Sequence, residues 1–91
     1  MAKVIITAEV EDLVAWEKAF RSHGDLFKRQ TVKKPISIST NEGNEVALIF
    51  RPKNLEIFMK ILETEGPTAM ANDGVKQETV KIFVLDKKFK P

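Results

Sequence analysis

Cysteine is absent from this 91-residue sequence, and histidine and tryptophan each occur only once. Without cysteine, the chain can form no disulfide, no thiolate nucleophile and no cysteine-based zinc site. One imidazole is too few for a transition-metal site within a single subunit, so we expect no metal. No apolar run approaches the roughly eighteen residues of a membrane span, and the run near the start is too short for a secretory signal. These absences predict a cytoplasmic protein that does not bind membranes.

Charge is nearly balanced, with 15 basic and 13 acidic residues and a formal net charge of +2. The basic excess comes mostly from Lys33–Lys34 and from three lysines near the end of the chain. This distribution differs from the single basic face that is typical of nucleic-acid binding. A hydrophobic content of 43% is enough for a modest core. We therefore expect one domain over residues 1–91, with a frayed tail at 86–91.

The pattern of apolar and turn-forming residues predicts four strands and two helices. The expected strands cover 3–10, 36–40, 45–51 and 79–85, the first helix runs from a cap at Asp12 to about Arg29, and the second helix follows a cap at Asn54. We expect Gly66–Pro67 to break that second helix, leaving a short piece over Thr68–Asp73 that Gly74 ends. The order of the elements predicts an α+β, ferredoxin-like βαββαβ fold with both helices on one face of an antiparallel sheet.

The opposite face of this sheet has no cover from its own chain. It is expected to carry a mixture of apolar and small polar side chains: Ile5, Thr7, Ser37, Ser39, Ala47, Ile49, Phe83 and Leu85. Contiguous apolar surface of this kind usually marks an interface. A two-fold homodimer with the sheets packed face to face is the prediction that follows.

RNA-recognition modules share this order of elements, so nucleic acid is an alternative partner. Those modules carry base-stacking aromatic residues on the two central strands. Here the strand at 3–10 has no aromatic residue, and the strand at 45–51 has only Phe50. We therefore expect no nucleic-acid partner.

The only histidine, His23, lies in an apolar helical stripe. The stripe is formed, at spacings of 3, 4, 3 and 4, by Leu13, Trp16, Phe20, His23 and Phe27. In one interpretation His23 is a buried imidazole whose hydrogen bonds are satisfied and whose role is structural. In the other it is a general acid/base, or it orients a ligand, at a mostly apolar cavity. The residues alone leave both interpretations open.

Four residues of the first helix, Asp12, Trp16, Phe20 and His23, form the pattern D-x3-W-x3-F-x2-H after an apolar strand, and Met70-Ala-Asn-Asp-Gly-Val75 follows the second helix. With this pattern the chain resembles small, largely uncharacterised bacterial proteins of the dimeric α/β-barrel superfamily, relatives of the antibiotic-biosynthesis-monooxygenase domain. The resemblance implies a homodimer with a ligand cleft between helices and sheet in each subunit. The chain lacks the tyrosine expected of the polyketide-type monooxygenases and the strand-one asparagine of the haem-degrading branch.

Two main hypotheses for function follow. In the first, the chain is a small-molecule-binding protein or a cofactor-independent enzyme for a small apolar or aromatic ligand, and no cofactor is expected. Trp16, Phe20 and His23 bound its cleft, Phe58 and Met70 close it, and His23 is the candidate acid/base acting on an enolisable or phenolic ligand. In the second, the chain is a non-catalytic homodimeric structural or regulatory module in which His23 is purely structural. A third, weaker reading is an oxygenase that acts on an aromatic substrate.

Overall fold

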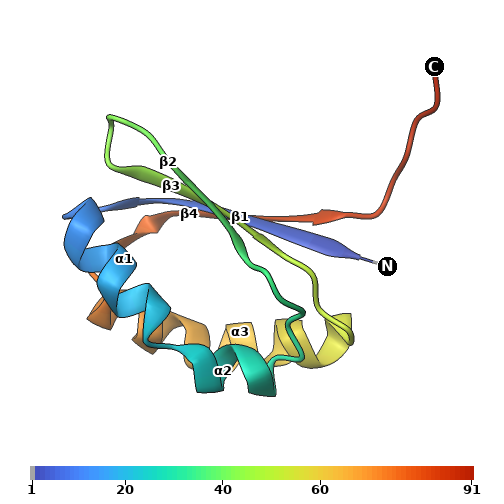
Figure 1. The fold of residues 1–91 in the computed structure, drawn as a ribbon, viewed down its shortest axis with the longest axis horizontal. Coiled ribbons are helices and arrows are strands. Elements are labelled where there is room, and N and C mark those ends of the chain that lie inside the picture. Colours follow the sequence, from blue (N-terminus) through green and yellow to red (C-terminus); the bar gives the residue numbers. More distant parts are fainter. Residues whose placement is uncertain (1) are drawn as a thin grey trace.

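The chain forms two layers, a four-stranded antiparallel sheet and a set of helices that covers one of its faces (Figure 1). The computed structural model describes residues 2–91. The elements are β1 (Lys3–Val10), α1 (Leu13–Arg21), α2 (Gly24–Arg29), β2 (Ser37–Thr40), β3 (Glu45–Phe50), α3 (Leu55–Asn72) and β4 (Val75–Leu85). The strands lie in the order β2-β3-β1-β4. The predicted α+β, ferredoxin-like fold is confirmed.

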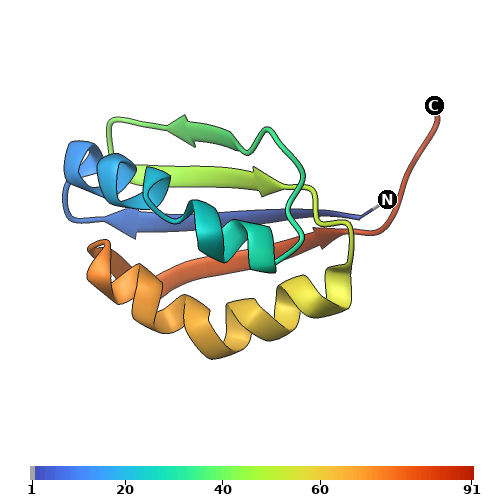
Figure 2. The same ribbon diagram turned by 60° about the horizontal axis from the view of Figure 1, so that its bottom comes forward.

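Strand β1 is central, with β3 on one side and β4 on the other (Figure 2). Ile6 pairs with Leu48 and with Ile82 on the helix-covered face. Ile5, one residue earlier, pairs with Ile49 and Phe83 on the opposite face. Because successive side chains of a strand alternate between faces, this register sets which residues enter the core. The buried strand residues of the core are Val4, Ile6, Ala8, Val10, Val46, Leu48 and Phe50.

Strand β4 begins at Val75, four residues earlier than predicted. Its first part pairs Val75 with Val10 and Lys76 with Glu9, and the register shifts between Thr7 and Glu9. The Glu9 amide donates a hydrogen bond to the Thr79 hydroxyl at this irregularity, at 2.8 Å. The sequence prediction missed residues 75–78 because a bulge interrupts the alternation on which it relied.

The predicted helix from Asp12 to Arg29 is in fact two helices. Asp12 caps α1 as expected, accepting a hydrogen bond from the Ala15 amide at 3.0 Å. The amides of Ser22 and His23 then bond to carbonyls three residues back, and α2 starts at Gly24. These tighter bonds end α1 and re-aim the chain. The apolar spacing did not reveal the break because His23 and Phe27 still face inward after it.

The predicted break at Gly66–Pro67 is wrong, because α3 runs without interruption from Leu55 to Asn72. Proline removes one backbone hydrogen bond from a helix interior. Packed side chains lie on both sides of Pro67, with Phe58 and Leu62 before it and Met70 after it. This packing holds the helix together, since most helix stability in proteins comes from tertiary contacts. Gly74, with φ of 77°, ends the helical segment as predicted.

Residues 86–91 form neither helix nor strand, and Figure 1 shows them leading away from the sheet. The division into a domain and a frayed tail stays a prediction. Within residues 2–91, none of the helices combines the length and the hydropathy that a membrane crossing requires.

Candidate functional site

A cavity of about 70 Å³ lies between the helices and the covered face of the sheet. Nearly all of the side chains around it are apolar, and His23, Gln30 and Asp73 are the exceptions. The five residues predicted to form a site all line this cavity: Trp16, Phe20, His23, Phe58 and Met70. The fold therefore brings together residues from α1, α3 and the turn that precedes α2. Their assignment as a site remains a prediction.

Aromatic rings form one wall of the cavity. Trp16 stacks on Phe20 with their centroids 5.0 Å apart, and Phe20 packs against Phe27 at 4.9 Å. Phe50 of β3 continues the cluster, at 5.7 Å from Phe27 and 5.3 Å from Phe58. Rings at these separations and tilts pack favourably. These rings give the cavity an apolar aromatic wall.

His23 is held by Asp73, which lies fifty residues later in the chain. Its Nε2 lies 2.8 Å from one carboxylate oxygen of Asp73 and 3.0 Å from the other. The Asp73 side chain is 8% exposed and that of His23 is 25% exposed. The pair joins the start of α2 to the end of α3 at the edge of the cavity. An imidazole beside a nearly buried carboxylate is an arrangement that can exchange a proton.

Asp73 occupies the C-cap of α3, and no basic residue lies in the last turn of that helix. A helix C-terminus carries partial negative charge and disfavours a carboxylate there by about 0.3–1 kcal/mol. Asp73 is therefore in an unfavourable position as far as its own helix is concerned. Its interaction with His23 offsets that placement.

Sequence reasoning missed two polar residues of the cavity, Asp73 and Gln30. Gln30 is buried, and its amide nitrogen donates to the carbonyl of Phe58 at 3.3 Å. Both were detectable from spacing: Gln30 continues the stripe three residues after Phe27, and Asp73 lies three residues after Met70. What no local pattern shows is that Asp73 meets His23.

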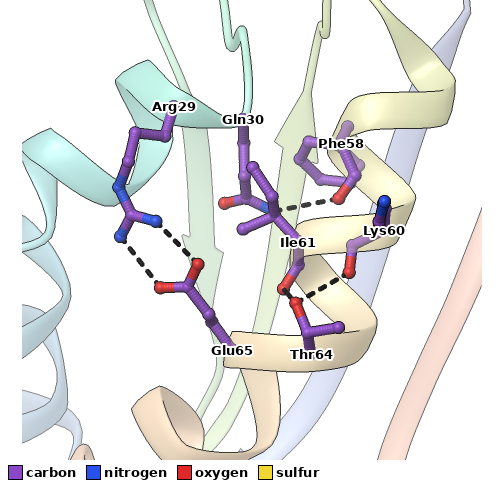
Figure 3. Close-up of polar contacts among 7 residues, drawn as sticks. All are labelled: Arg29, Gln30, Phe58, Lys60, Ile61, Thr64 and Glu65. Atoms are coloured by element: carbon purple, nitrogen blue, oxygen red, sulfur yellow. Dashed lines mark hydrogen bonds and ion pairs between the residues drawn. The ribbon is translucent and has the colours of Figure 1, made fainter.

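Helix α2 is fastened to α3 by further polar contacts (Figure 3). Arg29 makes two parallel bonds to Glu65, at 2.6 and 2.9 Å, and Gln30 reaches the Phe58 carbonyl nearby. The hydrogen bond and the charge of Arg29 lower the pKa of Glu65 below its ordinary value, and Glu65 raises the pKa of Arg29. With His23–Asp73, these contacts tie both ends of α2 to α3 along the cavity.

Glu65→Gln is expected to lower stability at neutral pH and to have little effect in acid. Because the folded-state pKa of Glu65 is lowered, its ion pair stabilises the fold above the ordinary carboxyl pKa of 4.5. That contribution is lost as pH falls through the lowered value. Both side chains are about half exposed, so the effect is small and decreases with salt. The urea unfolding midpoints of the unmodified protein and of Glu65→Gln, measured from about pH 7 to pH 3, check this. A difference between the two midpoints that does not change with pH would contradict the prediction.

A wider groove of about 400 Å³ lies between α3 and β4. Its lining includes Glu63, Pro67 and Val80. Leu62 and Met70 line both the groove and the cavity. Met70 is unbranched, and its side chain has three rotatable bonds.

Comparison with known proteins places the fold in one structural class. No protein-family model and no curated protein sequence matches this chain. A proposed antibiotic biosynthesis monooxygenase from Bordetella bronchiseptica shares its fold with a TM-score of 0.74, at 10% identity, over 97% of each chain. SnoaB, a cofactor-independent oxygenase from Streptomyces nogalater, matches with a TM-score of 0.69, at 14% identity, over 98% of this chain and 94% of its own.

A dimeric ferredoxin-like protein from an uncultured marine organism also matches, with a TM-score of 0.53 at 16% identity, over 99% of this chain and 91% of its own. The chain thus has the ferredoxin-like fold of the antibiotic-biosynthesis-monooxygenase type, which confirms the predicted resemblance at the level of the fold. At these identities the likeness concerns the fold alone, because one fold supports many functions.

Proposed function

We propose that the protein binds a small, mostly apolar ring compound in the cavity between helices and sheet, with His23 as its acid/base group. One observation carries this proposal. A cavity with almost entirely apolar walls contains an imidazole held by a nearly buried carboxylate, beside stacked aromatic rings. Binding pockets for small molecules commonly combine apolar walls with a few convergent polar groups.

The size of the cavity limits how large a ligand can be, and binding of a ring requires a side chain to move. Its 70 Å³ is smaller than the roughly 150 Å³ of an engineered apolar cavity that holds benzene. A ring therefore needs additional room, which the groove behind Leu62 and Met70 supplies when Met70 turns aside. In this proposal Met70 acts as the gate, and Trp16 and Phe20 supply the surface against which the ring stacks.

A homodimer through the open sheet face is the second part of the proposal. No helix covers this face in Figure 1. Ile5 and Phe83 pair on it directly, and Phe83 is 51% exposed. Exposed apolar surface of this kind favours association, and a two-fold axis lets one face serve both copies. The structurally similar marine protein is itself described as dimeric.

Gly66→Leu is expected to block ligand binding while the fold is kept. A Cβ at Gly66 would lie 3.1 Å from the end of the Leu62 side chain and 4.0 Å from Met70. A leucine there fills the space into which the cavity would widen, so the affinity falls at least tenfold. The overpacking costs about 1–3 kcal/mol of stability. Phenol and toluene serve as the ligands. Their binding is measured by the change in Trp16 fluorescence and in the NMR signals of His23.

Gly24→Leu is the matched control, since no atom lies within 4 Å of a Cβ at Gly24. It should bind both probes like the unmodified protein. If neither probe changes the Trp16 and His23 signals of the unmodified protein at millimolar concentration, the binding proposal is wrong. The chain is then better explained as a dimeric module in which the His23–Asp73 pair only ties two helices together.

A further inference from the structure

We propose that Asp73 is a positioning residue that keeps the proton of His23 on Nε2 and leaves Nδ1 free to accept one from the ligand. This inference rests on the function proposed above and gives a role to a residue that the sequence analysis did not place in the site. Asp73 does not touch the ligand in this scheme. It acts only through the imidazole.

The direction of the hydrogen bond follows from the chemistry of the pair. An ionised carboxylate accepts hydrogen bonds and has none to donate. Both Asp73 oxygens lie within 3.0 Å of Nε2, so Nε2 carries the proton whether the ring is neutral or charged. The bond made by one ring nitrogen sets the state of the other, and in the neutral ring Nδ1 then has a free lone pair.

Nδ1 is the ring nitrogen left available. Among residues 2–91, no hydrogen bond uses it, and His23 makes no side-chain cap to α2. No buried side-chain nitrogen or oxygen of these residues lacks a partner, so Nδ1 is accessible rather than sealed in the core. The 25% exposure of the His23 side chain agrees with this.

The His23–Asp73 pair favours a neutral ligand that donates a hydrogen bond over an anionic one. An acceptor at Nδ1 favours a neutral molecule that donates an O–H, and the nearby Asp73 carboxylate disfavours an anion. When the proton moves, the ligand O–H bond breaks, an N–H bond forms at Nδ1, and the electron pair stays on the ligand oxygen. The imidazolium then lies beside Asp73, which stabilises its charge.

The test compares phenol with toluene, which has a similar shape but no donor, in the unmodified protein and in Asp73→Asn. The asparagine amide can donate to Nε2 and shift the ring proton to Nδ1, as expected when a carboxylate that orients an imidazole becomes an amide. In Asp73→Asn the Kd for phenol should rise about tenfold, because the loss of one hydrogen bond changes the affinity by about that factor. The Kd for toluene should stay within twofold. The ¹⁵N shifts of the single imidazole, recorded above neutral pH, report the position of the proton without any ligand.

Two variants keep the comparison decisive. Asp73→Ala removes the carboxylate without offering a new donor, and Glu65→Gln breaks the other ion pair between α2 and α3 without touching His23. The phenol affinity should fall in both Asp73 variants and be unchanged in Glu65→Gln. Equal weakening of phenol and toluene in the Asp73 variants would mean a purely structural tie and would overturn the inference.

Two further results would overturn it for separable reasons. If the unmodified protein carries its ring proton on Nδ1, or if phenol binds equally well without Asp73, the positioning role is wrong and the binding proposal stands. If the unmodified protein binds neither probe, the proposed function fails and the inference fails with it.

Discussion

Phe83→Lys is expected to convert the proposed dimer into a monomer. Phe83 pairs with Ile5 on the sheet face that no helix covers, and 51% of its surface is exposed in the single chain. In a two-fold dimer each substitution occurs twice, and each removes an apolar anchor and buries an ammonium group. If each costs about 2 kcal/mol, the dimer dissociation constant rises about a thousandfold. Sedimentation velocity over a concentration series measures this directly.

Phe89→Lys provides the matched control for association. Phe89 is also exposed, at 85%, but it lies in the segment beyond β4 and outside the sheet. The same change of residue type there should leave the dissociation constant within a few fold. A Phe83→Lys protein that dimerises as well as the unmodified one would show that the contact uses another surface.

Phe58→Ala is expected to lower the free energy of unfolding by about 3–5 kcal/mol. Phe58 is fully buried, and its ring contacts that of Phe50 at a centroid distance of 5.3 Å. The substitution removes most of a buried ring and enlarges an existing cavity. A domain of this size has a total stability of roughly 5–14 kcal/mol, so the loss is a large fraction of it. Urea unfolding followed by circular dichroism gives the value.

Phe89→Ala makes the same change of residue type at an exposed position. Its effect should be within about 0.5 kcal/mol. A loss below about 1 kcal/mol in Phe58→Ala would show that the core around the cavity closes over the missing ring. The cavity would then be deformable enough to admit a ligand without the gate at Met70.

The strands were predictable because alternation along them is a direct consequence of burial on one face. Val4 and Ile6 face the helices and Ile5 faces the open side, as their spacing indicated. The breaks within helices were less predictable than their capped ends, since a break depends on backbone bonds and on distant packing. His23 keeps the apolar spacing across a break that it helps to create, and Pro67 remains within a helix that packs on both sides of it.

The apolar part of the candidate site was predictable for the same reason. Trp16, Phe20 and Phe58 belong to inward faces, and inward faces of neighbouring helices meet. The pairing of its polar residues was not predictable, because the partner of His23 is set by how α2 and α3 are placed relative to each other. Asp73 looks like an ordinary helix end until the fold brings it within 3.0 Å of the imidazole.

The central position of β1 has a consequence for how the protein is made. Lys3 pairs with Leu85, so β1 is synthesised well before β4, the strand that covers its second edge. Until β4 is made, β1 can pair only with β3. The other edge of this apolar strand then remains unpaired and can form hydrogen bonds with other chains. Slow translation of the residues before β4, or premature release of the chain, would therefore favour aggregation more than it would in a protein whose strands pair in sequence order.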